Sequence, residues 1–287
     1  MMCIVHRCPG AAAFLALAEP FLLRQEAAHN RILGLAGQLR NGSQQYPAPP
    51  YFAVVMNGEA VVAAIMRTPP HNLLLSAMPA DVLPAIADAV YAAYPALPGL
   101  LAPATISGDF AAAWQRVSGQ RSALRVAERI FQLDAVIPVR GVAGTPRAAG
   151  DHDRPLLIDW FRAFHEEIPQ AHERASIERA VDARLLVAPE IGGLWLWENG
   201  GQIVSLAGYS GPTAHGIRIG PVYTPPAHRS RGYASANVAA LSQWLLDGGR
   251  QFCFLFTDRA NPTANHIYYQ IGYRPVCDMD EYAFLPA

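Results

Sequence analysis

The sequence TPPAHRSRGYA occupies residues 224–234 and links a β-prone run at residues 217–223 to a helical pattern at residues 231–247. Apolar residues recur at helical spacing after this loop. They predict the side of the helix that packs on the core, formed by Val238, Leu241, Trp244 and Leu245. Gly248 and Gly249 are expected to end the helix. The order strand, loop, helix predicts an α/β fold.

The loop itself has the composition of an anion site. The first N–H groups of a helix are unpaired and the helix dipole favours negative charge there. Gly232 allows close approach of a ligand, Ala234 leaves the helix start uncrowded, and Arg229 and Arg231 add positive charge. A strand-to-helix turn that carries arginines without binding an anion would have the same residues 229–234. The sequence therefore indicates a phosphate site, and the residues around the loop have to support this assignment.

A related pattern occurs earlier in the chain, around a second Asn-Gly pair. Asn57-Gly58 lies between β-prone runs at residues 51–56 and 61–66, as Asn199-Gly200 lies between residues 194–197 and 203–209. Asn-Gly between such runs is typical of a hairpin with a type I′ turn. The sequence therefore predicts two related hairpins.

Each hairpin is followed by a proline-containing turn, a short strand and a helix. In the first half the strand is expected at residues 73–76 and the helix at 81–94, with Asp81 as its N-cap. A duplicated α/β domain explains this repetition, with domains at residues 1–138 and 139–287 and a Gly/Pro-rich linker at 138–150. The first-half loop, AMPA at residues 77–80, has no glycine. Only the second loop is expected to bind phosphate.

Composition excludes several classes of function. A length of 287 residues favours two domains, and 52% hydrophobic against 16% charged residues indicates a compact chain. The net charge of -1 gives no electrostatic case for nucleic acid, and no apolar run approaches the ~18 residues of a membrane span. All 22 cationic side chains are arginines, which excludes a P-loop lysine and a Schiff-base lysine.

No metal site or disulfide framework is expected. His165-Glu166 begins like the zinc motif H-E-x-x-H, but Pro169 stands where the second histidine belongs. The chain has only four cysteines and no C-x-x-C pair, and Cys253 lies in an apolar run where it reads as inert core. This cysteine usage favours a cytoplasmic protein.

Two motifs in the C-terminal half of the chain, at residues 229–234 and 261–273, together resemble the GNAT superfamily of N-acyltransferases. The cofactor loop of that family reads (Gln/Arg)-x-x-Gly-x-(Gly/Ala), and a later stretch reads Asn-x-x-Ala-x-x-(Leu/Ile)-Tyr-x-x-x-Gly-(Phe/Tyr). The residues that match are Arg229, Gly232, Ala234, Asn261, Ala264, Ile267, Tyr268, Gly272 and Tyr273. The resemblance covers residues 145–284. It implies two tandem GNAT-like α/β domains, each a mostly antiparallel mixed sheet with helices on both faces, the first degenerate and the second binding acetyl-CoA.

The resemblance also implies a set of cofactor-binding residues. They are Val222, Tyr223, Thr224, Arg229, Ser230, Arg231, Gly232, Tyr233, Ala234, Asn261 and Tyr268. The backbone before the loop would hold the pantetheine arm and the acyl carbonyl. Because Pro221 has no N–H, Val222 and Tyr223 are the better donors. Asn261 followed by Pro262 is also a good helix N-cap, and the two roles can coexist.

The family's general acid corresponds to Tyr268, whose hydroxyl is a donor at neutral pH. The sequence singles out no general base. Glu166 and Glu167 lie on the helix where the family often lines its acceptor site, while Glu198 and His215 are weaker candidates. A water chain without a single base is equally possible.

These expectations describe an N-acetyltransferase that moves an acetyl group from acetyl-CoA to a primary amine by direct attack in a ternary complex. The acceptor would be a small-molecule or peptide amine, with no metal, nucleic acid or membrane involved. Its identity and the oligomeric state are not indicated. The chief rival is a non-catalytic acyl-CoA-binding sensor or scaffold, and a third reading is a structural pair of partner-binding domains.

Overall fold

The computed structural model describes residues 3–42, 46–167 and 177–286. The chain forms two compact units. Unit 1 contains the residues up to Ile130, Thr257–Ala260 and the residues from Val276 onward, and unit 2 contains Phe131–Phe256 and Asn261–Pro275. The units are discontinuous in sequence, unlike the expected single boundary after residue 138, because most of the last strand, from Val276 onward, belongs to unit 1.

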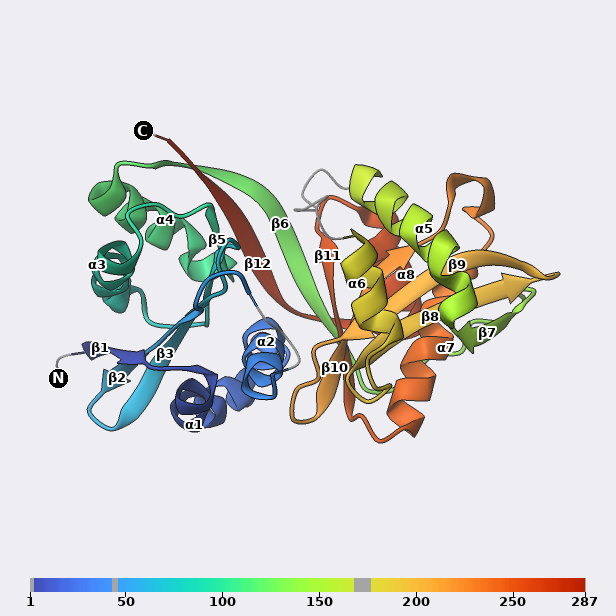
Figure 1. Ribbon diagram of the computed structural model, residues 1–287, viewed down its shortest axis with the longest axis horizontal. Helices are drawn as coiled ribbons and strands as arrows, with labels where there is room; N and C mark the ends of the chain where they lie inside the picture. The colour runs from blue at the N-terminus through green and yellow to red at the C-terminus, as the bar shows by residue number, and fades with distance from the viewer. Residues whose placement is uncertain (1–2, 43–45, 168–176, 287) are drawn as a thin grey trace. The chain divides into compact units, whose positions relative to one another are not determined.

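The same order of elements runs through both units (Figure 1). Unit 1 contains β1 (Cys3–Cys8), α1 (Ala11–Leu22), α2 (Asn30–Arg40), β2 (Tyr51–Asn57), β3 (Ala60–Arg67), β4 (Leu73–Leu75), α3 (Leu83–Ala93), β5 (Gly99–Pro103) and α4 (Ala104–Ser118). Unit 2 contains β7 (Thr145–Ala148), α5 (Arg154–Glu167), α6 (Ile177–Leu185), β8 (Gly192–Asn199), β9 (Gln202–Ser210), β10 (Gly216–Tyr223), α7 (Tyr233–Asp247), β11 (Phe252–Asp258) and α8 (Pro262–Ile271). Two long strands, β6 (Arg121–Leu133) and β12 (Arg274–Leu285), follow α4 and α8.

Unit 1 has helices on both faces of its sheet. Most neighbouring strands are antiparallel, and β4 and β5 are parallel. Alternate residues of a strand point to opposite faces. Ala53 and Val55 belong to the core that α3 and α4 complete, while the ring of Phe52 lies 5.1 Å from that of Phe14 on α1.

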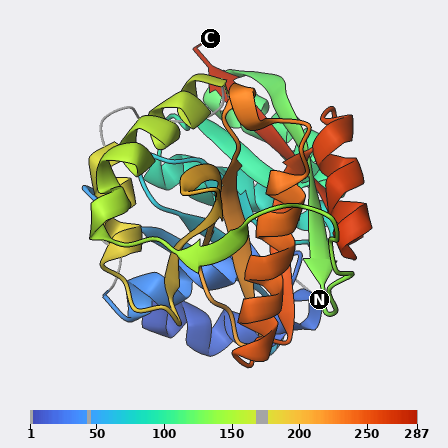
Figure 2. The same cartoon turned by 90° about the vertical axis from the view of Figure 1, so that its right-hand side faces the viewer.

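Unit 2 repeats this layered arrangement. β10 pairs antiparallel with β9 and parallel with β11. Leu241 and Leu245 of α7 pack with Ile271 of α8 on one face, and Leu157 of α5 packs with Val181 of α6 on the other. In Figure 2 the strands of unit 2 lie between α5, in yellow-green, and α7, in orange. The expected mixed α/β class with mostly antiparallel sheets is confirmed.

Both Asn-Gly hairpins form, and only the second has the expected type of turn. In the second hairpin Gly200 and Gly201 both have positive φ (59° and 78°), as a type I′ turn requires. In the first, only Gly58 does (62°), which fits a type II′ turn over Gly58 and Glu59. Asn57 ends β2 with ordinary strand geometry, so its expected place in a type I′ turn was wrong.

Several local expectations were overturned by packing. Residues 145–148 form β7 inside the expected linker, because they pair with β8. Trp244 lies at the edge of the core: its side chain is 39% exposed, and its ring lies 4.8 Å from that of Trp195 and 5.7 Å from that of Tyr209. Asp81 lies in a short 3-10 turn, and Val82 precedes the first residue of α3. β12 was not expected, and its residues Met279–Ala283 pair antiparallel with β5.

Candidate functional site

The site lies next to the point where the pairing of β10 with β11 ends. The two strands pair in parallel where Gly216–Arg218 lie opposite Phe252–Phe254. Farther along, the register of β10 against β9 shifts between Ile219 and Val222, which marks a β-bulge. Bulges bend a strand and increase its twist. A cleft of about 630 Å³ lies beside this end of β10.

The cleft brings together most of the residues expected from the sequence. Those lining it are Glu167, Val222, Tyr223, Thr224, Arg229, Ser230, Gly232, Tyr233, Ala234, Asn261 and Tyr268. Glu166 and Arg231 are exposed and are not among the lining residues. Phe164 and His228 also line the cleft. Both were missed, although Phe164 lies one helical turn before Glu167 and His228 directly precedes Arg229.

The loop between β10 and α7 ends in a sharp turn. Ser230 and Gly232 both have left-handed backbones, with φ of 60° and 79°. The N–H of Ala236 donates to the Gly232 carbonyl at 2.9 Å. The N–H groups of Tyr233, Ala234 and Ser235 precede this bond, so they have no partner within the helix. The first turn of α7 carries no acidic residue, and this helix end is suited to an anion.

Arg229 is held at two points beside the cleft. Its Nε donates to the Thr224 carbonyl at 2.8 Å, and its Nη2 lies 2.7 and 2.6 Å from the two carboxylate oxygens of Glu167. The side chains of Arg229 and Glu167 are 45% and 42% exposed. Water therefore screens this ion pair.

The end of β10 is fixed from behind. Thr224 Oγ1 donates to Ser205 Oγ at 3.0 Å, and Ser205 Oγ donates to the Tyr223 carbonyl at 3.4 Å. The Tyr223 ring packs against Trp160 and Phe164 with centroids 5.9 and 6.4 Å apart. Burial, followed by the charge of Glu167, raises the pKa of Tyr223.

α8 and its N-cap supply further residues of the cleft lining. The Asn261 side chain accepts a hydrogen bond from the Ala264 N–H at 3.0 Å, so the expected N-cap is confirmed. Tyr268 is half-buried, and its ring lies 6.2 Å from Phe131 and 5.8 Å from Tyr273. Burial raises the pKa of Tyr268 to about 12. The phenol therefore stays protonated at neutral pH and can donate.

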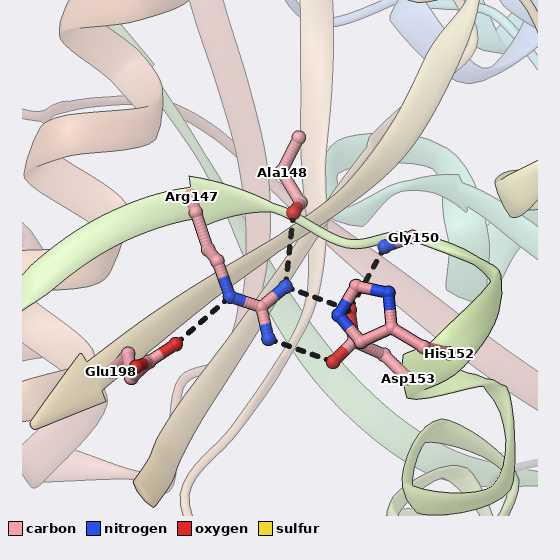
Figure 3. Close-up of polar contacts among 6 residues, drawn as sticks. All are labelled: Arg147, Ala148, Gly150, His152, Asp153 and Glu198. Atoms are coloured by element: carbon pink, nitrogen blue, oxygen red, sulfur yellow. Dashed lines mark hydrogen bonds and ion pairs between the residues drawn. The ribbon is translucent and has the colours of Figure 1, made fainter. Parts of the chain in front are cut away.

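The weaker base candidates lie outside the cleft lining. Glu198 Oε2 accepts from Arg147 Nε at 3.0 Å, and the same guanidinium donates to both oxygens of Asp153 at 2.7 Å (Figure 3). Glu198 thus belongs to a structural network that ties β7 and the start of α5 to β8. His215 precedes β10 and is exposed. Neither is a lining residue.

The corresponding loop of unit 1 is occupied by its own contacts. The N–H of Ala77 donates to Nε2 of buried His29 at 3.2 Å, and Ser76 Oγ accepts from the Ala64 N–H at 2.9 Å. Pro79 precedes the 3-10 turn that leads into α3 and has no N–H. This loop thus lacks the glycine of its counterpart, and Pro79 offers no N–H to a ligand.

Within residues 3–42, 46–167 and 177–286, no group of three or more His, Cys, Asp or Glu side chains is placed to hold a metal ion. Pro169 lies outside these residues. Of the helices in the described part of the chain, none has the length and apolar character needed to cross a membrane.

Comparison with known proteins gives a family match for part of the chain and several solved structures of similar fold. Residues 155–273 match the model of the acetyltransferase (GNAT) family. A GCN5-related N-acetyltransferase from Kribbella flavida has a TM-score of 0.60 at 16% identity, over 90% of this chain and 96% of its own. One from Sphaerobacter thermophilus has 0.59 at 17%, over 98% and 94%. A tandem GNAT protein from the clavulanic acid biosynthesis pathway has 0.53 at 13%, over 100% and 99%. No curated protein matches in sequence.

Proposed function

We propose that the protein is a cytoplasmic N-acetyltransferase, because residues 155–273 match the model of the acetyltransferase (GNAT) family. It transfers the acetyl group of acetyl-CoA to a primary amine by direct attack in a ternary complex. The observation that carries this proposal is one cleft lined by the anion-binding loop, the end of β10 and Tyr268. The acceptor is a small-molecule or peptide amine.

Positive charge and free backbone N–H groups in the cleft support the assignment of acetyl-CoA to it. The free N–H groups at the start of α7, together with Arg229, suit its diphosphate. Val222 and Tyr223 lie on the same strand just before the loop and would hold the pantetheine arm and the acyl carbonyl. Asn261, the N-cap of α8, also lines the cleft and would contact the arm.

Tyr268 is the proposed general acid. When the amine attacks the thioester carbonyl, the C–N bond forms, the C–S bond breaks, and the sulfur leaves as a thiolate that needs a proton. A phenol whose burial raises its pKa to about 12 remains protonated and can supply that proton. Within the described part of the chain its hydroxyl has no hydrogen-bond partner, which suits a group that acts on the ligand.

The amine must lose a proton before it attacks, because an alkylamine is mostly protonated at pH 7. We assign this proton to water in the cleft. Glu166 is exposed away from the cleft lining, and Glu167 is engaged by Arg229. Neither carboxylate is free beside the end of β10.

Two measurements test the proposed function. The first is the shift in melting temperature on addition of acetyl-CoA, which rises with ligand concentration if the folded protein binds it. The second follows the release of free thiol from acetyl-CoA across a panel of amines. Binding without turnover on any amine would favour the acyl-CoA-binding sensor or scaffold. Absence of any shift would contradict both readings and leave a partner-binding protein.

A further inference from the structure

Glu167 has a partner that points to a role different from acid–base chemistry. Its two carboxylate oxygens lie 2.7 and 2.6 Å from Nη2 of Arg229, whose Nε donates to the Thr224 carbonyl. Two attachments in different directions restrain the long arginine side chain. One lies on the end of β10 and the other on α5.

α5 presents Glu167 from a firmly packed surface. Trp160, Phe164 and Glu167 are spaced by four and three residues, which places them on one face of the helix. The first two rings pack on Tyr223. The Tyr223 side chain also interacts with both Glu167 and Arg229. The position of Arg229 is therefore set by two elements beside the cleft, the end of β10 and α5.

We propose that Glu167 is a positioning residue for cofactor binding, which holds the guanidinium of Arg229 ready for the diphosphate of acetyl-CoA. It takes no part in the transfer of the acetyl group. This inference rests on the proposed function, and it gives Glu167 a role in donor affinity in place of the expected role as base.

Two opposing effects of the Glu167 carboxylate decide whether its loss weakens or strengthens the binding of acetyl-CoA. An unrestrained arginine has rotamer freedom worth a factor of roughly 30 in binding, and the ion pair removes part of that freedom before the ligand arrives. A water-exposed carboxylate about 8 Å from an anion repels it by a factor of only about two. Ordering of Arg229 outweighs repulsion, so loss of Glu167 weakens donor binding.

The test compares two donors in the full-length protein. Acetyl-CoA carries the diphosphate, and S-acetylpantetheine lacks it. In Glu167→Gln we expect KM and Kd for acetyl-CoA to rise about three- to tenfold while kcat stays within about twofold. With S-acetylpantetheine the variant matches the wild type. Glu167→Asp restores part of the affinity, and the neighbouring Glu166→Gln, the matched control, changes neither constant.

Three outcomes would overturn the assignment. A fall in kcat with both donors would make Glu167 a base that acts on the amine. Unchanged or tighter binding of acetyl-CoA would show that the ion pair does not prepare Arg229. A further loss of affinity on adding Glu167→Gln to Arg229→Gln would show that Glu167 acts without Arg229. A wild type that binds no acetyl-CoA overturns the proposed function itself, together with this role.

Discussion

Gly232 lies against Val142, and a Cβ placed on Gly232 would come within 2.8 Å of Val142 Cγ2. Gly232 also has a left-handed backbone with φ of 79°. The glycine of the anion-binding loop thus serves the turn into α7 and its packing, besides any contact with a ligand.

Gly232→Ala should therefore destabilise the protein by about 1–2 kcal/mol for the left-handed conformation of a residue with a Cβ, and the contact of the new Cβ with Val142 adds to this cost. We also expect the affinity for acetyl-CoA to fall at least about tenfold, because the turn sets the start of α7. Urea unfolding and titration calorimetry measure the two effects. In a Val142→Ala background the stability cost should shrink, and an equal cost there would exclude the contact as a cause.

Tyr268→Phe removes the hydroxyl and keeps the ring between Phe131 and Tyr273. The Kd for acetyl-CoA should stay within about twofold, while kcat falls about 100-fold, as for loss of a general acid. Because the pKa of Tyr268 is raised to about 12, the wild-type rate should show no loss from its ionisation below about pH 11. Unchanged turnover in the variant would remove Tyr268 from the chemistry.

Two substitutions separate the role of Asn261 as a helix cap from its role as a ligand contact. Asn261→Ala should cost about 1 kcal/mol of stability, because the Ala264 N–H loses its acceptor. Asn261→Asp keeps the cap, so its stability should match the wild type, while the missing amide and the added charge should weaken acetyl-CoA binding. If the Asp variant bound acetyl-CoA as tightly as the wild type, Asn261 would be a cap alone.

The network in Figure 3 predicts an acid-sensitive contribution to stability. Hydrogen bonds from Arg147 hold the pKa of Asp153 below its usual range. This contribution is present above about pH 4 and is lost as pH falls through the lower pKa of the folded state. Arg147→Gln should cost about 2 kcal/mol at pH 7 and less in acid. Urea unfolding between about pH 3 and 7 checks this, and a cost that stays constant with pH would argue against the pair.

His29 predicts a second pH effect, in unit 1. Burial lowers its pKa, and this outweighs the hydrogen bond from its Nδ1–H to the Leu22 carbonyl. Since Nε2 accepts from the Ala77 N–H, the folded state holds the ring neutral. Stability should be full above about pH 6.5 and fall below it by up to about 1.4 kcal/mol per pH unit. In His29→Gln, unfolding should lose this slope. Retention of the slope would assign it to another group.

Much of the cofactor side of the cleft was predictable because it depends on local backbone preferences. Glycine at position 232 tolerates the left-handed turn, and the helix that follows starts beside it. Asn261-Pro262 caps the next helix at the expected residue. Both signals act within a few residues, so a single sequence reveals them.

The partners of the candidate bases could not be predicted from the sequence. Glu166 and Glu167 are neighbours on one helix, yet only Glu167 lines the cleft. Glu198 is taken by Arg147, a partner on another strand. Which carboxylate meets which arginine depends on how strands and helices pack, and residue type and spacing carry no trace of it.

The sequence by itself determined the repeated order of strands and helices, the anion-binding loop and the cap at Asn261, because each follows from hydrophobic periodicity and backbone preference over a short stretch. Only the tertiary structure decided that Glu167 holds Arg229, that Tyr268 and the loop share one cleft, and that β12 completes the sheet of unit 1 beside β5. Those pairings join segments far apart in the chain, and they are selected by burial of apolar surface and by satisfaction of hydrogen bonds across the whole fold.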